Sequence, residues 1–549
     1  MNHTNQPQLP EWFLYDGDGK AVANFIPKVL ACQEVFTPAG EKCETFVRLS
    51  LNFADGTNVE ITVSHSDLDQ LNWPELNRRC IFSPNYRNAR GYIAIIIRAE
   101  LCHAPVETVY RLDRAGIFHI NDAVIFAAGD RVITRSPTAE ATPSFDLGQI
   151  PFHLDIDPEL TVAKAFEGMG ELINLSAEIG RVLVAHVISG ITRAAFKEAG
   201  LTPCAVLVVM GKSGMLKSHY VPHMVQLYNR QNGIGAVTRF NSTKRFIEDA
   251  LYDYSECTAV IDDLHTAESR SIKRRNEETA EEIIRRIGDD TGRGRMDGHT
   301  HVQQQFRGNA VFIGEYTIGK ASTIPRVLVV EITSPPNGAI LDKYQRHHPL
   351  VVSTFYYYFI QWYVDHFAEI CAAIDDSLTK SREATANSSI HGRLRDTQLY
   401  LQLSYMLFLK FCTESQCFSE QDATDECNDF SDYLTRLIQA QQARFDQDSN
   451  SKTVDYLNLI RYLYHNSGFR LAKSKKDFNP IIHDGLIYYD CLCLRGECLK
   501  NRLSQFVPHF SFNDCINSLL DVRALKLVGN KYTVQIDGTG GKRFYAIRI

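Results

Sequence analysis

The segment CAVLVVMGKSGMLKSHYVPHMVQLYN, residues 204–229, combines an apolar run, a glycine-containing loop and a helical pattern. An uninterrupted apolar run is typical of a strand buried on both faces, as in a parallel sheet. The loop GKSGMLKS, residues 211–218, keeps the first glycine and the lysine–serine pair of the pattern GxxxxGK[ST] at the expected spacing. This strand–loop–helix order predicts a loop whose backbone N–H groups hold phosphate oxygens.

The loop residues have distinct expected roles in binding a nucleotide. Lys217 is expected to reach the β- and γ-phosphates of ATP, and Ser218 to ligate Mg²⁺. Leu216 stands where the pattern has its second glycine. A plain glycine turn between a strand and a helix is the alternative interpretation of this loop taken alone. The predicted nucleotide-binding residues are Gly211, Lys212, Ser213, Gly214, Met215, Leu216, Lys217, Ser218 and His219.

A second apolar run, TAVIDDLH at residues 258–265, ends in two acidic residues about 45 positions downstream of the loop. The carboxylate of Asp262 is expected to hold Mg²⁺ together with Ser218, and that of Asp263 to polarise the attacking water. The alternative is a surface turn after a core strand. Two acids after four apolar residues, downstream of a phosphate loop, favour the functional interpretation.

Two further strand ends carry candidate catalytic residues. The run AVFIG ends in Glu315, which is expected to sense the γ-phosphate. Arg326 lies directly before the apolar run VLVVEI and is expected to act as an arginine finger on the ATP of a neighbouring subunit. A simple strand cap and a surface ion pair remain the respective alternatives.

The segment RGRMDGHTHVQQQFRGNA, residues 293–310, is basic and contains an Asp-Gly turn. It predicts a hairpin that projects into a central pore, where Arg293, Arg295 and Arg307 contact DNA phosphates without reading sequence. A solvated hairpin without ligand is the alternative.

Composition and termini limit the class of protein. The 549 residues carry a net charge of −7, so no global basic field indicates a nucleic-acid partner, although a local basic lining can suffice. The N-terminal sequence lacks the build of a signal peptide and no run is long enough to span a membrane, which predicts a cytoplasmic protein without membrane contact. The 14 cysteines show no CxxC spacing and are expected to be reduced core or surface thiols.

The order of secondary-structure patterns predicts an α/β fold. Strand-like segments dominate residues 12–160, and they include FVRLSLNF (46–53), VEITVS (59–64), YIAIIIRAE (92–100) and AVIFAAGDRVI (123–133). The polar segment 136–148 is a candidate linker. Apolar strands then alternate with helical segments, which indicates a parallel sheet covered by helices. Two helices and a strand hairpin near the C-terminus fit a winged-helix module.

Several of these segments resemble a known family in their order. The loop GKSGMLKS resembles the phosphate loop of minichromosome maintenance (MCM) helicases. The order RLDRAGIFHINDAVIFAAGDRVI, GKSGMLKS, AVIDDLH, TGRGRMDGHTHVQQQFRGNAVFIGE and a terminal winged helix is similar to the cassette chromosome helicases (Cch type) of staphylococcal cassette elements and related mobile elements. The resemblance covers roughly residues 90–340 well and the C-terminal module loosely.

The resemblance implies an AAA+ P-loop core, ATP hydrolysis, a hexameric ring and 3′-to-5′ translocation on DNA near the replication origin of an element. It gives Lys217 and Ser218 the phosphate-loop roles, Asp262 and Asp263 the acidic-strand roles, and Arg326 the finger role. Two features depart from the family. Leu216 replaces a frequent glycine, and Asp263 replaces a more usual glutamate, which shortens the reach to water by one methylene.

The combined prediction is an ATP-dependent DNA helicase or translocase that replicates a mobile element as a homo-hexamer, together with replication partner proteins. Its four parts are an N-terminal β-rich α+β domain (1–150), an AAA+ core (151–345), a helical region (346–475) and a winged-helix domain (476–549). Two other functions stay open: an AAA+ ATPase that regulates or remodels proteins, and an origin-binding protein without unwinding activity.

Overall fold

The computed structural model of the chain is a mixed α/β structure that divides into two compact units, Met1–Arg444 and Phe445–Ile549. These units do not follow the predicted four-part division, which stays a prediction. The described residues are 11–134, 144–148, 150–230, 237–264, 270–290, 294–297, 300–303, 305–316, 322–384, 388–451, 455–507, 510–528 and 531–549.

The N-terminal part of the first unit is built on a five-stranded sheet in the order β10-β6-β3-β4-β5. Its core gathers around Phe25 and the fully buried Trp73. The predicted linker 136–148 lies largely outside the described residues, but its end forms β10 and pairs with β6. The elements of this part are β1 (Leu14–Tyr15), β2 (Ala21–Ala23), β3 (Phe25–Phe36), β4 (Lys42–Phe53), β5 (Asn58–Ser64), η1 (His65–Asp67), α1 (Trp73–Leu76), α2 (Ala89–Leu101), β6 (Val106–Arg111) and β10 (Ser144–Asp146).

The predicted strand at 92–100 is wrong, because these residues lie in helix α2. The prediction rested on the run of isoleucines, which favour strands. Ile93 and Ile97 are buried four residues apart, which is the helical spacing, whereas Ile95 between them is 66% exposed. The Asn88 side chain also caps the helix by accepting a hydrogen bond from the Gly91 N–H. Burial of one helical face therefore outweighs the intrinsic strand preference.

A three-stranded antiparallel sheet and a set of helices connect this part to the central sheet. The predicted strand segment 123–133 is confirmed as the hairpin of β8 and β9. The helical periodicity expected after residue 158 is confirmed as three successive helices. The elements are β7 (Gly116–Ile120), β8 (Ala123–Ala128), β9 (Arg131–Thr134), β11 (Phe152–His153), α3 (Val162–Asn174), α4 (Ala177–Ile191) and α5 (Arg193–Glu198).

The central sheet has five parallel strands in the order β14-β15-β18-β12-β19, as the apolar runs predicted. Strand β18 lies between the loop-bearing strand β12 and the acidic strand β15, so three candidate strand ends meet at one sheet edge. The strands and intervening elements are β12 (Val206–Met210), α6 (Lys217–Val225), β13 (Asn229–Arg230), β14 (Val237–Arg239), α7 (Lys244–Asp253), β15 (Thr258–Leu264), α8 (Arg270–Gly288), β16 (Gly294–Asp297), β17 (Thr300–Gln303), β18 (Asn309–Gly314), η2 (Ile324–Arg326) and β19 (Val327–Glu331).

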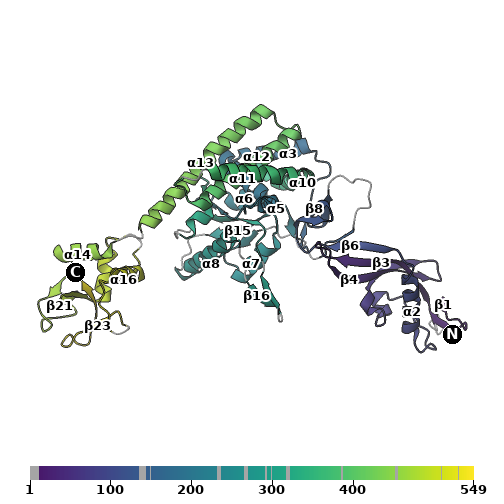
Figure 1. Cartoon of the computed structure of the whole chain (residues 1–549), viewed down its shortest axis with the longest axis horizontal. Helices are drawn as coiled ribbons and strands as arrows, with labels where there is room; N and C mark the ends of the chain where they lie inside the picture. Colours follow the sequence, from purple (N-terminus) through teal and green to yellow (C-terminus); the bar gives the residue numbers. More distant parts are fainter. Residues whose placement is uncertain are drawn as a thin grey trace, which may run out of the picture. The chain divides into compact units, whose positions relative to one another are not determined.

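Helices cover both faces of this sheet. Figure 1 shows α7 and α8 on one side of it, with α5, α6, α11 and α12 on the other. One continuous hydrophobic core joins the sheet to these helices and includes the predicted aromatic helix at 355–363, which lies in α10. The helices that follow the sheet are α9 (Gly338–His347), α10 (Val351–Asp365), α11 (Phe367–Ala384), α12 (Gly392–Glu414) and α13 (Glu420–Ser451).

The second unit combines three helices with a five-stranded sheet in the order β20-β21-β22-β24-β23. The two predicted helices and the terminal antiparallel strands are present, and α14 precedes them. The elements are α14 (Tyr456–His465), β20 (Leu471–Ala472), β21 (Gly485–Tyr488), β22 (Cys491–Leu494), α15 (Gly496–Leu503), α16 (Phe512–Asp521), β23 (Val534–Gln535) and β24 (Arg543–Arg548). Across the described parts of both units, no helix combines the length and apolar character that crossing a membrane requires.

Candidate nucleotide-binding site

The predicted phosphate loop connects β12 to α6 at the carboxyl edge of the parallel sheet. The Gly211 N–H donates to the carbonyl of Gly314 at 3.2 Å, which ties the start of the loop to β18. A Cβ on Gly211 would lie only 2.8 Å from the carbonyl oxygen of Ile332. The backbones of loop and sheet therefore approach too closely for any residue but glycine at this position.

The middle of the loop turns through two left-handed residues, Gly214 with φ +85° and Leu216 with φ +53°. The second value explains why glycine is frequent at the position of Leu216, since an L-residue there costs roughly 1–2 kcal/mol. The Leu216 side chain lies toward Gly338 at the start of α9, where an added Cβ would be 3.5 Å from Leu216 Cδ1. Leucine thus keeps the loop geometry that glycine would give.

Lys217 is the first residue of α6, and its side chain folds back so that the ammonium group lies within the loop. Its Nζ donates to the carbonyls of Gly211 at 2.7 Å and Lys212 at 2.8 Å, and the residue is 8% exposed. Burial lowers the pKa of Lys217, whereas the nearby carboxylates of Glu315 and Asp262 act to raise it. The cation is therefore held by weak neutral acceptors that a phosphate oxygen would replace favourably.

The two predicted acids lie inside β15, directly before its last residue, Leu264. The pairing with β18 shifts between Ile261 and Leu264, so Asp262 and Asp263 together face a single residue of β18. This is a β-bulge, a feature that re-aims side chains next to active sites. Asp263 adopts a left-handed backbone with φ +78°, and its N–H donates to Asp262 Oδ1 at 2.7 Å.

A cavity of about 370 Å³ brings most of the predicted residues together. Glu315, which follows β18, shares it with the loop and with both aspartates. Gly211 and Lys212 are not part of the lining, although their carbonyls hold Lys217. The lining residues are Ser213, Gly214, Met215, Leu216, Lys217, Ser218, His219, Asp262, Asp263, Leu264, Ile313, Gly314 and Glu315.

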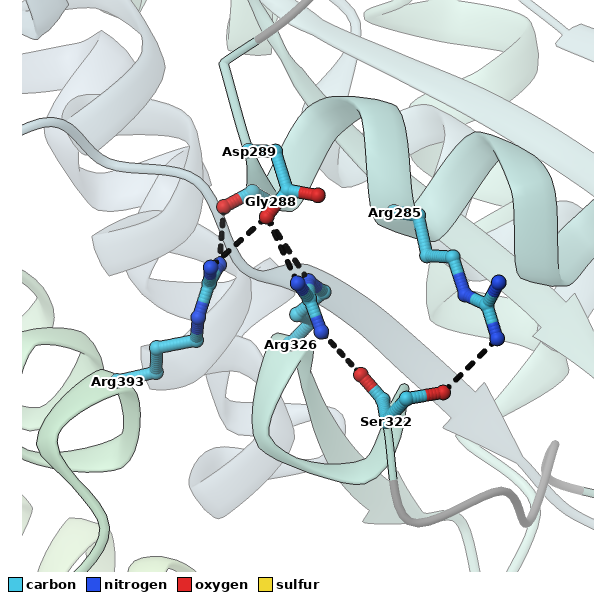
Figure 2. A network of polar contacts seen from close by, with 6 residues as sticks. All are labelled: Arg285, Gly288, Asp289, Ser322, Arg326 and Arg393. Atoms are coloured by element: carbon cyan, nitrogen blue, oxygen red, sulfur yellow. Dashed lines mark hydrogen bonds and ion pairs between the residues drawn. The ribbon is translucent and has the colours of Figure 1, made fainter.

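Arg326 lies outside this cavity, in the short helix η2 before β19. Its guanidinium binds the carboxylate of Asp289 and the carbonyl of Ser322 (Figure 2). The structure therefore separates this arginine from the phosphate loop of its own chain. That separation is what a residue serving another subunit requires.

The predicted basic hairpin is present as the antiparallel strands β16 and β17, which project away from the central sheet (Figure 1). Arg293 falls outside the described residues, and Arg295 lies on β16, where its side chain is not described. Arg307 is exposed and lines a second cavity of about 300 Å³, together with Arg114 and Lys197.

Glu256 is a buried carboxylate that belongs to no recognisable sequence motif. It joins the start of β15 to the β7 hairpin: Oε2 accepts from the Ile117 N–H at 3.0 Å, and Arg114 Nη1 lies 3.4 Å from Oε1. A Cβ on Gly116 would lie 2.5 Å from its carboxyl carbon, so only glycine fits there. Burial raises the pKa of Glu256 to about 7, against the opposing effects of Arg114 and the Ile117 N–H.

Replacement of Glu256 by glutamine is expected to flatten the pH dependence of stability between pH 4.5 and 7. Because the folded-state pKa is raised, folding takes up a proton, and stability falls as pH rises through this window. The variant is expected to gain thermal stability relative to wild type toward pH 8, by up to roughly 3 kcal/mol. Thermal melts from pH 5 to 8 measure this difference.

The matched control is Glu171→Gln, because Glu171 is an exposed carboxylate of the same unit. A hydrogen bond from Tyr344 and the charge of Lys343 hold the pKa of Glu171 below its usual value. Its difference from wild type should stay constant over the same pH range. A constant difference for the Glu256 variant as well would contradict the buried-carboxyl assignment.

The donor set at the cavity suits a nucleoside triphosphate with Mg²⁺. The Ser218 hydroxyl and the Asp262 carboxylate are hard oxygen ligands, and Mg²⁺ usually completes its shell with waters and substrate phosphates. The buried Lys217, held only by carbonyls, and the N-terminus of α6 are suited to phosphate charge. The cavity volume also lies within the usual range for ligand pockets. Among the described residues, no three His, Cys, Asp or Glu side chains gather as a metal centre.

Comparisons with known proteins identify the fold. No family model matches the sequence, and no curated protein matches it. The solved structure described as "SCCmec type IV Cch - active helicase" matches with a TM-score of 0.54 and 14% identity, covering 96% of this chain and 93% of that one. A JCV helicase structure matches with a TM-score of 0.22 and 10% identity, over 44% of this chain and 72% of that one. The NrS-1 C-terminal region matches with a TM-score of 0.23 and 11% identity, over 71% and 90%.

Proposed function

We propose that this chain, whose fold is shared with the SCCmec type IV Cch helicase along almost its whole length, is an ATP-dependent DNA helicase. In this proposal it has an AAA+ core, acts as a homo-hexameric ring in the replication of a mobile element, and carries a winged-helix module at its C-terminus. The observation that carries the proposal is the shared cavity of Lys217, Asp262, Asp263 and Glu315.

The cavity supports ATP as the substrate by its charge distribution. Cationic Lys217 and the N-terminus of α6 lie on one side, on the loop after β12. The carboxylates of Asp262 and Asp263 belong to β15, and Glu315 directly follows β18, the strand between β15 and β12. Phosphate binding needs the cationic side of the cavity, and a metal ion with an attacking water needs the carboxylates.

In the proposed mechanism, the chain's own residues bind and orient the reacting groups. Lys217 leaves the carbonyls of Gly211 and Lys212 and holds phosphate oxygens. Ser218 and Asp262 would hold Mg²⁺, which when bound would neutralise charge on the phosphates. Asp263, re-aimed by the bulge, accepts a hydrogen bond from the attacking water, and Glu315 orients that water or senses the γ-phosphate. Arg326 of one subunit acts on the ATP of the next.

The basic hairpin is the proposed DNA contact within this function. Strands β16 and β17 lie between α8 and β18 in the sequence, so only residues 304–308 separate the hairpin from the strand that Glu315 follows. A change at the γ-phosphate would therefore reach the hairpin through a single buried strand. Arg293, Arg295 and Arg307 are the proposed phosphate contacts, which would give salt-sensitive binding without sequence preference.

A strand-displacement assay on a forked DNA duplex tests the proposal. Wild-type protein is expected to release the labelled strand only with ATP and Mg²⁺, because unwinding must be driven by hydrolysis. Single-stranded DNA is expected to raise the ATPase rate several-fold. Mass photometry with ATP and DNA is expected to show six copies per particle.

The same assay separates the alternative functions. DNA-stimulated hydrolysis without strand displacement would instead identify a remodelling ATPase. DNA binding without any nucleotide turnover would identify an origin-binding protein. Either result would overturn the helicase assignment.

A further inference from the structure

Three segments that are far apart in the sequence meet at the carboxylate of Asp289, the residue that follows α8 (Figure 2). Arg326 comes from η2 and Arg393 from the first turn of α12. Both guanidinium groups donate to Asp289 Oδ1, through Nη2 of each arginine at 2.8 Å. One acidic residue therefore holds two arginines from different parts of the fold.

The contacts of Arg326 fix the orientation of its guanidinium and leave part of it available. Nε and Nη2 both donate to Asp289 Oδ1, at 3.3 and 2.8 Å, and Nη1 donates to the Ser322 carbonyl. These contacts use three of the five N–H groups of an arginine. Among the described residues, one N–H on each terminal nitrogen has no further partner, and two N–H groups of one guanidinium can bind a phosphate or carboxylate in a bidentate manner.

The surroundings of Asp289 keep this arrangement in place. Arg393 Nη1 donates to the Gly288 carbonyl, so the same arginine holds both the end of α8 and the carboxylate. A Cβ on Gly288 would lie 2.6 Å from Arg326 Cδ, which shows how closely the Arg326 stem packs on the helix end. Arg285 Nη2 donates to Ser322 Oγ at 2.9 Å and thereby steadies the residue whose carbonyl holds Arg326.

The charge and the exposure of the residues around Asp289 indicate that this network orients Arg326. Asp289 is 38% exposed, and ion pairs at such sites contribute little to stability. Arg326 and Arg393 share the carboxylate of Asp289, so these three side chains together carry one net positive charge. Burial alone would raise the pKa of Asp289, but hydrogen bonds from Arg326 and Arg393 hold it below its usual value. The carboxylate therefore stays ionised while the cluster remains attractive to an anion.

We infer that Asp289 is a positioning residue for Arg326. Arg393 holds Asp289 in place, and Asp289 binds one edge of the Arg326 guanidinium. The two remaining N–H groups of Arg326 then face the triphosphate bound by an adjacent copy of the chain. The inference rests on the proposed function, because it takes that triphosphate to be ATP. Asp289 does not line the cavity formed by the phosphate loop and the acidic strand, so the residues of that cavity take no part in positioning Arg326.

Mixed rings of two inactive variants provide the test. A Lys217→Ala subunit cannot use ATP but still offers Arg326, whereas an Arg326→Ala subunit retains its phosphate loop but offers no finger. Mixing the two creates interfaces in which an intact loop faces an intact Arg326, so ATP hydrolysis measured without DNA, where the sites need not act together, is expected to return. An inactive mixture would overturn the action of Arg326 between subunits, and the positioning role with it.

Asp289→Asn is then placed in one of the two partners at a time. In the Lys217→Ala subunit it lies beside the working Arg326 and is expected to lower kcat about 10- to 100-fold, since misplacement of a catalytic group has effects of this size. The KM for ATP is expected to stay unchanged, because the other subunit binds the nucleotide. In the Arg326→Ala subunit the same substitution is expected to have no effect on kcat.

Asp290→Asn is the matched control. Asp290 is the next residue and binds Arg193 and Lys197, not Arg326. Its substitution is expected to lower the melting temperature without any dependence of kcat on the subunit that carries it. Equal loss of activity for both placements of Asp289→Asn, or no loss for either, would overturn the positioning role while leaving the helicase proposal intact.

Discussion

Replacement of Lys217 by alanine is expected to reduce ATP hydrolysis by about 10³-fold or more, with the fold intact. The Nζ atom is held at 2.7 and 2.8 Å by loop carbonyls, at the centre of the proposed phosphate cradle. No other lysine or arginine lines this cavity, so within the described residues no cation is present to replace it. Phosphate release with and without single-stranded DNA measures the loss.

The fold should tolerate this change because Lys217 is a buried cation whose desolvation is unfavourable. Circular dichroism and the melting temperature are therefore expected to match wild type. The control is Lys164→Ala, an exposed lysine of α3, which should retain the full rate. Hydrolysis at the wild-type rate by the Lys217 variant would show that the cavity is not the ATPase site.

Replacement of Arg326 by alanine is expected to leave ATP binding unchanged and to lower turnover by about 10³-fold. Binding is retained because Arg326 does not line the cavity of its own chain. Turnover is lost because a guanidinium stabilises charge that develops on the transferring phosphoryl group. Titration with a fluorescent ATP analogue and steady-state ATPase assays separate the two effects.

Mixing the Arg326 variant with wild type tests whether the sites of one ring depend on each other. Strand displacement is expected to fall more steeply than the fraction of wild-type subunits, because each variant subunit disables the site of its neighbour and one inactive site stalls unwinding by the ring. Arg346→Ala, which removes an exposed arginine paired with Asp342 on α9, should not change the rate. A linear decline of strand displacement with the variant fraction would contradict this coupling, and the mixed rings of Lys217→Ala and Arg326→Ala subunits separate action between subunits from action within one.

Patterns within single segments predicted much of the fold and of the candidate site. The strand–loop–helix unit at 204–229, the acids after TAVI, and the hairpin of β16 and β17 are all present where the sequence placed them. Each is a local feature that shows in the order and spacing of the residues within one segment. The prediction of a strand at 92–100 was wrong because contacts with other segments decide its structure. Its isoleucines fit either structure, and burial against β3 and its neighbours decided for the helix.

The sequence by itself determined the parallel sheet, the strand–loop–helix unit at 204–229 and the order of polar strand ends, because these follow from short-range periodicity and spacing. Only the tertiary structure decided that a bulge re-aims Asp262 and Asp263 and that Glu256 is buried against Gly116. It also decided that Asp289 joins Arg326 to Arg393. These contacts connect residues from separate segments, and side-chain packing, which no single segment specifies, brings them within hydrogen-bonding distance.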